Sequence, residues 1–169
     1  MVGKMNNPRF KYPDTKAYEF VVHRLEERGV NLEELAKIVY ETQKGFEPDL
    51  TLEICQKFLI DTMHKRELLN SAMVALELDR LTEEGKVDEP LAGIIRNDAG
   101  VFGVDETLAL QIANIYGTIG TTNFGYFDRV KSGIIAKFDH DKVHVNTFID
   151  DILAAIVAAV RSEEHTSEL

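Results

Sequence analysis

The sequence has no tryptophan and only one cysteine, Cys55. A single cysteine excludes an intramolecular disulfide, and we expect Cys55 to be a small buried residue of a protein kept in a reducing compartment. No apolar run approaches the roughly 18–20 residues that a membrane-spanning helix needs. Residues 1–11 also lack the apolar segment of a signal peptide. These absences predict a soluble, cytoplasmic protein.

Positive charge is scarce as well. The chain has 19 Lys and Arg residues against 29 Asp and Glu residues, which gives a formal net charge of -10. This balance disfavours nucleic acid and anionic membrane surfaces as partners. Acidic clusters suit divalent cations, which offset the repulsion between an acidic site and a phosphate. We therefore expect no nucleic-acid partner.

The last nine residues, 161–169, read RSEEHTSEL and resemble the in-frame translation of a sequencing-library adapter. We expect this tail to be an artefact, with the natural protein continuing differently after Val160. His165, which lies in the tail, is therefore not a candidate functional residue.

Helical periodicity and helix-capping residues dominate the first part of the chain. Asp14 or Thr15 is placed to cap a first helix that ends at Gly29, and Asn31 is placed to cap the next. Further helices are predicted over residues 32–44, 51–65, 66–84, 91–96 and 104–116, with an Ala-rich helix opened by Asp150 and Asp151 at the end.

Beyond Gly100, glycines appear inside apolar sequence. Gly117 and Gly120, close to Ala113, predict a point where another backbone approaches, and the Ala-rich last helix is the natural partner. No alternating run is long enough to predict a strand. We expect an all-α, single multihelical bundle with a central small-residue helix pair. The domain is expected at residues 14–160, after a flexible N-terminal arm at 1–13.

Three acidic points lie in this second half: Asp105 with Glu106, Asp128, and Asp150 with Asp151. Both pairs stand where a helix should begin, so a bundle can bring them together. Carboxylates form oxygen-rich sites that suit Mg²⁺ or Mn²⁺. The intervening cations Arg129 and Lys131 are candidates for contacting phosphate oxygens.

A purely structural interpretation stands beside the metal site. Thr147, with Asp150 three residues later, resembles a capping box with Asp in place of Glu or Gln. Asp151 also gains from the helix dipole in the first turn. By this interpretation the aspartates only cap the last helix.

Other motifs in the segment fail on context. Asp139 and Asp141 fit the D-x-D pattern of haloacid-dehalogenase phosphatases, but too little chain follows for that α/β domain. The same aspartates begin a possible calcium loop, in which His144 occupies the position of the required Gly. His140 and His144 alone are weak evidence for zinc.

The chain nevertheless resembles a known family, the phosphatidylglycerophosphatase A family, and most closely its soluble branch, which includes the low-temperature-requirement C proteins. The segments that carry the resemblance are 103–106, 114–120, 123–134 and 148–155. In layout it covers roughly residues 14–160, and it is specific from about Asn97 onward.

The resemblance implies Mg²⁺-dependent hydrolysis of a phosphomonoester, phosphatidylglycerophosphate, to phosphatidylglycerol and phosphate. One or two metal ions would neutralise the phosphate and lower the pKa of a bound water, and a carboxylate would accept its proton. The implied catalytic residues are Asp105, Glu106, Asp128 and Asp151. The implied metal ligands are Asp105, Glu106, Asp128, Asp150 and Asp151, and the implied phosphate-binding residues are Lys131 and Arg129.

The chain also departs from the family pattern. It lacks the apolar spans of the membrane-embedded members, and Ser132 stands where the family usually has Pro. The expected partner is therefore a phospholipid headgroup, reached from the membrane periphery, or a small soluble phosphomonoester. The alternative is a non-catalytic helical binding or regulatory member of the same family. Small-residue helices and exposed apolar faces suggest a homodimer or homotetramer.

Overall fold

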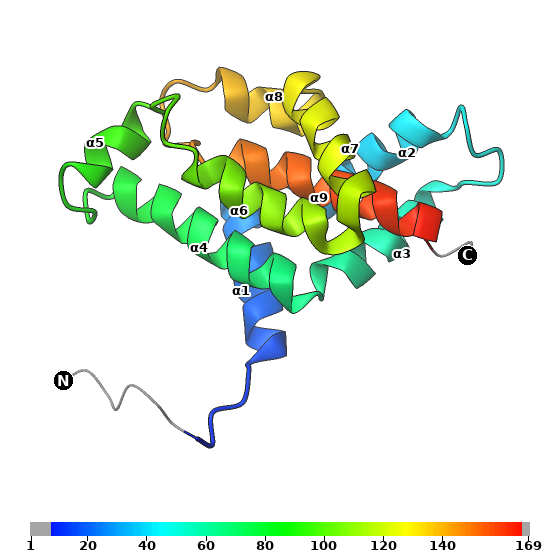
Figure 1. Ribbon diagram of the computed structural model, residues 1–169, viewed down its shortest axis with the longest axis horizontal. Helices are drawn as coiled ribbons and strands as arrows, with labels where there is room; N and C mark the ends of the chain where they lie inside the picture. Colours follow the sequence, from blue (N-terminus) through cyan, green and yellow to red (C-terminus); the bar gives the residue numbers. More distant parts are fainter. Residues whose placement is uncertain (1–7, 167–169) are drawn as a thin grey trace.

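The computed structural model describes residues 8–166, with side chains described through residue 163 (Figure 1). Within this range the chain folds into helices and contains no strand, which confirms the predicted all-α class. The helices are α1 (Asp14–Glu27), α2 (Leu32–Gln43), α3 (Leu52–Met63), α4 (Arg66–Glu83), α5 (Leu91–Arg96), α6 (Val104–Ala113), the 3₁₀ turn η1 (Asn114–Tyr116), α7 (Gly117–Arg129), α8 (Gly133–His140) and α9 (Ile149–Thr166).

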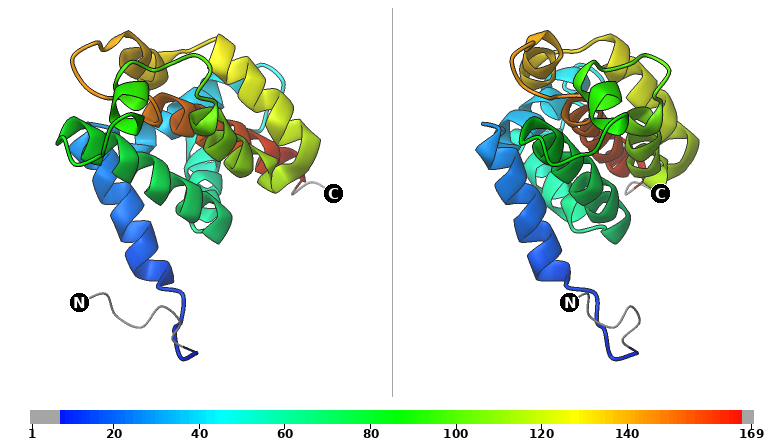
Figure 2. Two further views of the ribbon diagram at one scale, coloured as in Figure 1. Left: turned by 60° about the vertical axis from the view of Figure 1, so that its left-hand side comes forward. Right: turned by 90° about the vertical axis from the view of Figure 1, so that its left-hand side faces the viewer.

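Helix α9 forms the centre of the bundle. It packs against α2, α3, α4, α6, α7 and α8, as the views in Figures 1 and 2 show. From Ile152 to Val160 every side chain is at most 1% exposed. A helix that is apolar on all sides is stable only inside a core. The alanines of α9 allow the surrounding helices to approach closely.

The predicted close approach occurs at Gly120. A Cβ atom added there would lie 1.9 Å from the carbonyl oxygen of Ala113 and 3.5 Å from Oγ of Ser162 in α9. The same prediction was wrong for Gly117, where an added Cβ would meet nothing within 4 Å. Gly117 instead has a φ of 70°, a left-handed conformation that glycine adopts without steric cost where η1 passes into α7.

The predicted helix caps were only partly correct. Asn31 caps α2 in a capping box with Glu34, and the Thr51 side chain accepts from the Ile54 N–H at 3.3 Å. The first helix begins after Pro13, without a side-chain cap from Asp14 or Thr15. Residues 117–140, for which no helix was predicted, contain α7 and α8.

The predicted arm and tail lie partly outside the described residues. Of the arm at 1–13, residues 8–13 are described, and Tyr12 donates a hydrogen bond to Oδ1 of Asn70 at 2.8 Å. Of the tail at 161–169, the described residues continue α9, which leaves their expected adapter origin untested. None of the helices described is both long and apolar enough to cross a membrane.

Candidate metal centre

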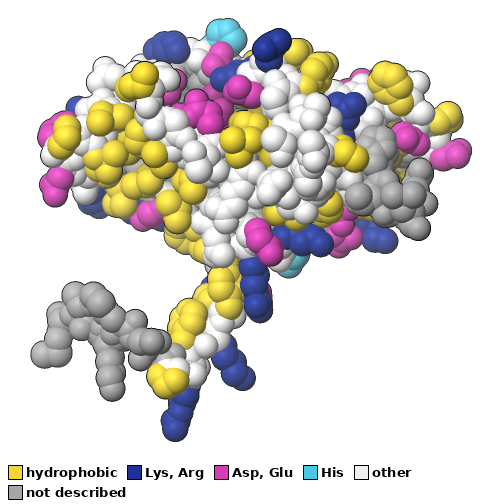
Figure 3. Space-filling model, viewed as in Figure 1, with side chains coloured by type: hydrophobic (Ala, Val, Ile, Leu, Met, Phe, Trp, Pro, Cys, Tyr) yellow, Lys and Arg dark blue, Asp and Glu magenta, His cyan; other side chains and the backbone are white. Residues whose placement is uncertain are grey.

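The first turns of α6 and α9 meet, and this brings together carboxylates from two of the three predicted acidic points. One carboxylate oxygen each of Asp105, Glu106 and Asp151 lies within 4.8 Å of the others. We call these residues the acidic trio. Both helices begin here, so their N–H dipoles favour negative charge at the same place. Figure 3 shows acidic side chains gathered on this face, between α5 and α8 and above the start of α6.

Burial makes the acidic trio unusual. Asp105 is 5% exposed and Asp151 is 6% exposed, whereas Glu106 lies nearer to solvent. Oδ1 of Asp105 is buried and has no hydrogen-bond partner among the described residues. A buried carboxylate oxygen without a partner is costly, because it has lost water and gained nothing in return. A cation would remove that cost.

The pKa values of the trio respond to this crowding. Burial, followed by a hydrogen bond with Glu106, raises the pKa of Asp105 above its ordinary value. The same hydrogen bond, with Asp105 as donor, lowers the pKa of Glu106. Burial and the charges of Asp150 and Asp128 raise the pKa of Asp151. Asp105 and Asp151 therefore keep their protons to higher pH than isolated carboxyl groups do, and a cation would compete with those protons.

Lys131 binds the carboxylates of Asp139 and Asp150 and lies near that of Asp128. Its Nζ donates to Oδ1 of Asp139 and to Oδ2 of Asp150, both at 2.7 Å, and lies 4.0 Å from Oδ1 of Asp128. Burial opposes its charge, but the two bonded carboxylates raise the pKa of Lys131 above its ordinary value. Asp150 is thus directed to Lys131 and is not part of the trio.

The capping-box interpretation of Asp150 was wrong. The Thr147 hydroxyl donates to the carbonyl oxygen of Ile95 at 2.5 Å, and the Asp150 carboxylate accepts from Lys131. With these partners, Thr147 and Asp150 do not make the reciprocal hydrogen bonds of a capping box.

The remaining predicted residues lie at the C-terminal end of α7. Asp128 is near enough to Asp151 to raise its pKa, but it is not one of the clustered carboxylates. Arg129 is the last residue of α7 and is exposed. The metal-binding role of Asp128 and the phosphate-binding role of Arg129 stay predictions.

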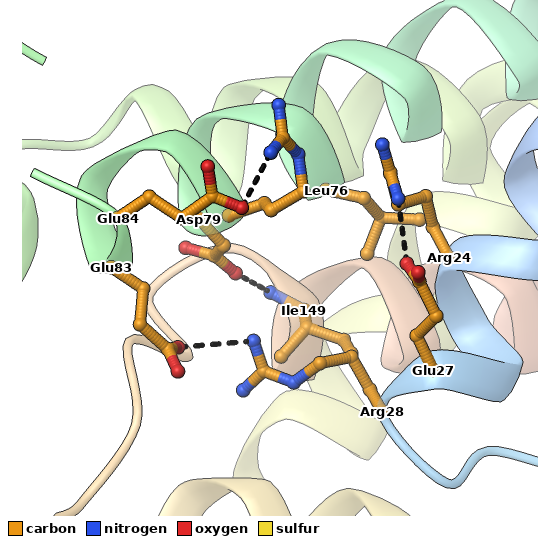
Figure 4. Close-up of a pocket in the computed structure, with 9 residues that line it drawn as sticks. Arg24, Glu27, Arg28, Leu76, Asp79, Glu83, Glu84 and Ile149 are labelled. Atoms are coloured by element: carbon orange, nitrogen blue, oxygen red, sulfur yellow. Dashed lines mark hydrogen bonds and ion pairs between the residues drawn. The ribbon is translucent and has the colours of Figure 1, made fainter. Parts of the chain in front are cut away.

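The start of α9 is held by a residue that the sequence analysis missed. Asp79 of α4 is 2% exposed. Its carboxylate accepts from the Phe148 N–H at 3.1 and 3.2 Å and from the Ile149 N–H at 3.0 Å, as Figure 4 shows for Ile149. Asp79 follows Leu76 by three residues, so the helical period of the apolar stripe places it on the buried face of α4. That spacing was the available signal.

Arg28, the residue directly after α1, holds the loop before α9. It donates to Oδ1 of Asn146 and, at 3.3 Å, to the carbonyl oxygen of Val145, and it pairs with Glu83 at 3.5 Å. Together with Asp79 it lines a cavity of about 240 Å³ between α1 and α4 (Figure 4). Helices α1 and α4 thus fix the position from which Asp150 and Asp151 project.

Comparisons with known proteins agree with this architecture. The family model described as phosphatidylglycerophosphatase A matches residues 22–163. The uncharacterised protein YutG of Bacillus subtilis is 41% identical over 157 residues, which cover 92% of each chain. The crystal structure of YpjQ from Bacillus subtilis matches with a TM-score of 0.85 and 36% identity, over 93% of this chain and 98% of the other. The crystal structure of the low temperature requirement C protein from Listeria monocytogenes matches with a TM-score of 0.83 and 41% identity, over 92% and 96%.

Proposed function

This chain belongs to the phosphatidylglycerophosphatase A family, and we propose that it is a Mg²⁺-dependent phosphomonoester hydrolase. Family membership indicates phosphatase chemistry in lipid metabolism. The finer proposal is that the substrate is the headgroup of phosphatidylglycerophosphate or a smaller soluble phosphomonoester, and that the acidic trio holds the metal.

The observation that carries the proposal is the unpartnered Oδ1 of Asp105 within the acidic trio. Oxygen-only ligands of this kind suit Mg²⁺, and Mn²⁺ is the closest substitute. When bound, the cation supplies Lewis acidity and offsets the negative charge that would otherwise repel a phosphate. The residues present fit that group, because three carboxylates converge and one of their oxygens has no hydrogen-bond partner in the part of the chain that the structure describes.

The chain's own residues supply the remaining functions. Asp128, whose side chain is 42% exposed and whose charge acts on Asp151, accepts the proton of the attacking water. The water oxygen forms a bond to phosphorus as the P–O ester bond breaks, and the proton taken up by Asp128 passes to the leaving oxygen, so that the products are the alcohol and inorganic phosphate. Lys131 uses two of its three N–H donors on Asp139 and Asp150, so one remains for a phosphate oxygen.

The experiment is phosphate release from phosphatidylglycerophosphate and from glycerol 3-phosphate, with Mg²⁺ and with EDTA. We expect metal-dependent turnover, and a loss of at least about 100-fold for Asp151→Asn, since electrostatic groups at the reacting centre contribute on that order. Asp88→Asn, an exposed residue before α5, is the matched control. Absence of metal-dependent turnover by the unmodified chain would leave the non-catalytic interpretation, a helical binding or regulatory member, in its place.

A further inference from the structure

Asp139 binds Lys131, but it belongs neither to the acidic trio nor to the residues that the family resemblance implies. It lies in the last turn of α8, where an acidic side chain faces the negative end of the helix dipole. Its side chain is 41% exposed, so the need to fill a core does not explain the residue. A side chain in a locally unfavourable place is typical of a functional site.

Lys131 needs an anchor for its ammonium group. The residue lies in the short connection between α7 and α8, residues 130–132, and a lysine side chain is a flexible four-carbon stem. Its neighbours Val130 and Ser132 are exposed, and Ser132 makes no side-chain hydrogen bond that would cap α8. The position of the ammonium therefore depends on the groups that bind Nζ itself.

Two carboxylates from two different helices bind it. Nζ lies 2.7 Å from Oδ1 of Asp139 in α8 and 2.7 Å from Oδ2 of Asp150 in α9. The three N–H bonds of an ammonium group are arranged tetrahedrally, so directing two of them also directs the third. With Asp150 alone, the group could rotate about a single hydrogen bond. Asp139 therefore sets the direction of the third N–H.

Helix α8 holds Asp139 in place because the helix is itself firmly packed. Ile135 is 0% exposed and Phe138 is 4% exposed, and α8 contacts both α2 and α9. The side chain of Asn146 donates to the carbonyl oxygen of Phe138 at 3.3 Å. Asp139 directly follows Phe138, so its position is fixed relative to the start of α9, which carries Asp151.

The anchored ammonium acts on the acidic trio. Nζ lies 4.0 Å from Oδ1 of Asp128, whose charge in turn raises the pKa of Asp151. The pKa of Glu106 is lowered first by its hydrogen bond with Asp105 and further by the charge of Lys131. The positive charge of Lys131 is therefore felt where a phosphate would lie at the trio.

We propose that Asp139 is a positioning residue of the phosphatase reaction, which directs the ammonium of Lys131 toward the phosphate and acts only through Lys131. The inference rests on the proposed phosphatase function and adds a residue to it. Misplacing a group at the reacting centre by about 1 Å can cost about 100-fold in rate. The rival interpretation is that Asp139 withholds Lys131 from the phosphate, in which case its removal would strengthen substrate binding.

The test measures kcat and KM for Mg²⁺-dependent phosphate release from phosphatidylglycerophosphate and from glycerol 3-phosphate. Asp139→Ala should lower kcat/KM at least about tenfold, with most of the loss in kcat, because the affected contact is to charge that develops in the transition state. Asp139→Asn keeps one carbonyl acceptor for Lys131 and should retain more activity than Asp139→Ala. The matched control is Asp141→Asn, two residues on, which keeps the Oδ1 that accepts from the Val143 N–H at 2.8 Å.

A double-mutant cycle separates positioning from a purely structural role. Lys131→Gln should lower kcat/KM by more than Asp139→Ala does. The double variant, with both substitutions, should be no slower than Lys131→Gln alone, because Asp139 then has no ammonium to direct. A residue that only stabilised α8 would lower the rate in both backgrounds.

The outcomes separate this inference from the proposed function. An Asp139→Ala variant as active as the control, a variant with a lower KM and undiminished kcat, or additive effects in the cycle would each overturn the positioning role and leave the phosphatase function standing. If Asp139→Ala does not fold, Asp139→Asn replaces it in the cycle and should lower kcat/KM only when Lys131 is present. No Mg²⁺-dependent turnover by the unmodified chain overturns the phosphatase function and the positioning role with it.

Discussion

Replacing Asp79 with alanine removes the acceptor that holds the first two N–H groups of the α9 region. Each buried donor left without a partner costs about 1–3 kcal/mol, so two of them cost about 2–6 kcal/mol. The cavity beside Asp79 gives water access to the freed donors, which places the expected loss near the lower end, about 2–3 kcal/mol. Substitution of an ordinary helix N-cap lowers the free energy of unfolding by about 0.5–2 kcal/mol. The loss expected for Asp79→Ala is therefore larger than that for an ordinary cap.

The loss should be measured by urea unfolding and located by amide hydrogen exchange. We expect Asp79→Ala to lower the free energy of unfolding by that amount and to speed exchange at the Phe148 and Ile149 amides. The Glu33 amide, which donates its capping hydrogen bond to Oδ1 of Asn31 at the start of α2, should exchange as before. Asp79→Asn keeps one carbonyl acceptor and should lose about half as much. Asp88→Ala, at an exposed site, should stay within about 0.5 kcal/mol.

The reasoning would be refuted if Asp79→Ala were as stable as the control, or if the Phe148 and Ile149 amides kept their protection. Either result would mean that α9 is positioned by packing alone. Global destabilisation without faster exchange at those two amides would count against the role of Asp79 as a cap.

Three further predictions follow from the packing and the charges. Gly120→Ala should lower the free energy of unfolding in urea by about 1–3 kcal/mol or more, because its Cβ would lie 1.9 Å from a backbone oxygen. Gly125→Ala, whose Cβ would meet nothing within 4 Å, should raise it by up to about 1 kcal/mol. Equal effects of the two substitutions would contradict the close approach at Gly120. Lys131→Gln should lower the free energy of unfolding by about 1–3 kcal/mol, since it leaves two carboxylates unpaired, with exposed Lys137→Gln as the unaffected control. Mg²⁺ affinity measured by calorimetry should rise with pH between about 5 and 8, because burial raises the pKa of Asp105 and Asp151 and their protons compete with the metal. An affinity that does not depend on pH would mean that Mg²⁺ does not bind at the acidic trio.

Local patterns predicted the parts of the fold that depend on local interactions. The Asn31 cap requires only a Glu three residues on, and both lie within one turn. The last helix was predictable because its apolar composition has no alternative to burial. Helix α7 was not predicted, since three glycines in it oppose helix formation. Its helical state depends on packing against α9, which a local pattern does not contain.

The candidate site divides in the same way. The sequence predicted that acidic pairs at the starts of two helices would come together, and the first turns of α6 and α9 bring Asp105, Glu106 and Asp151 close to one another. The capping assignment of Asp150 was wrong, since its partner Lys131 lies 19 residues away and a capping pattern considers only four; its assignment as a metal ligand stays a prediction. Asp79 was missed for a similar reason. It acts on Phe148, 69 residues later. Its spacing from Leu76 indicates that it is buried, but not which residue it contacts.

The central position of α9 also has a consequence for biosynthesis. The helix follows, in sequence, every helix that surrounds it. While the chain is being made, the earlier helices leave the ribosome with their apolar faces uncovered, because the segment that fills the space between them has not yet been translated. The core is completed when α9 enters, and the same event brings Asp151 to Asp105 and Glu106. Core formation and assembly of the acidic trio are therefore a single late step, so the trio is absent from a nascent chain until α9 has packed.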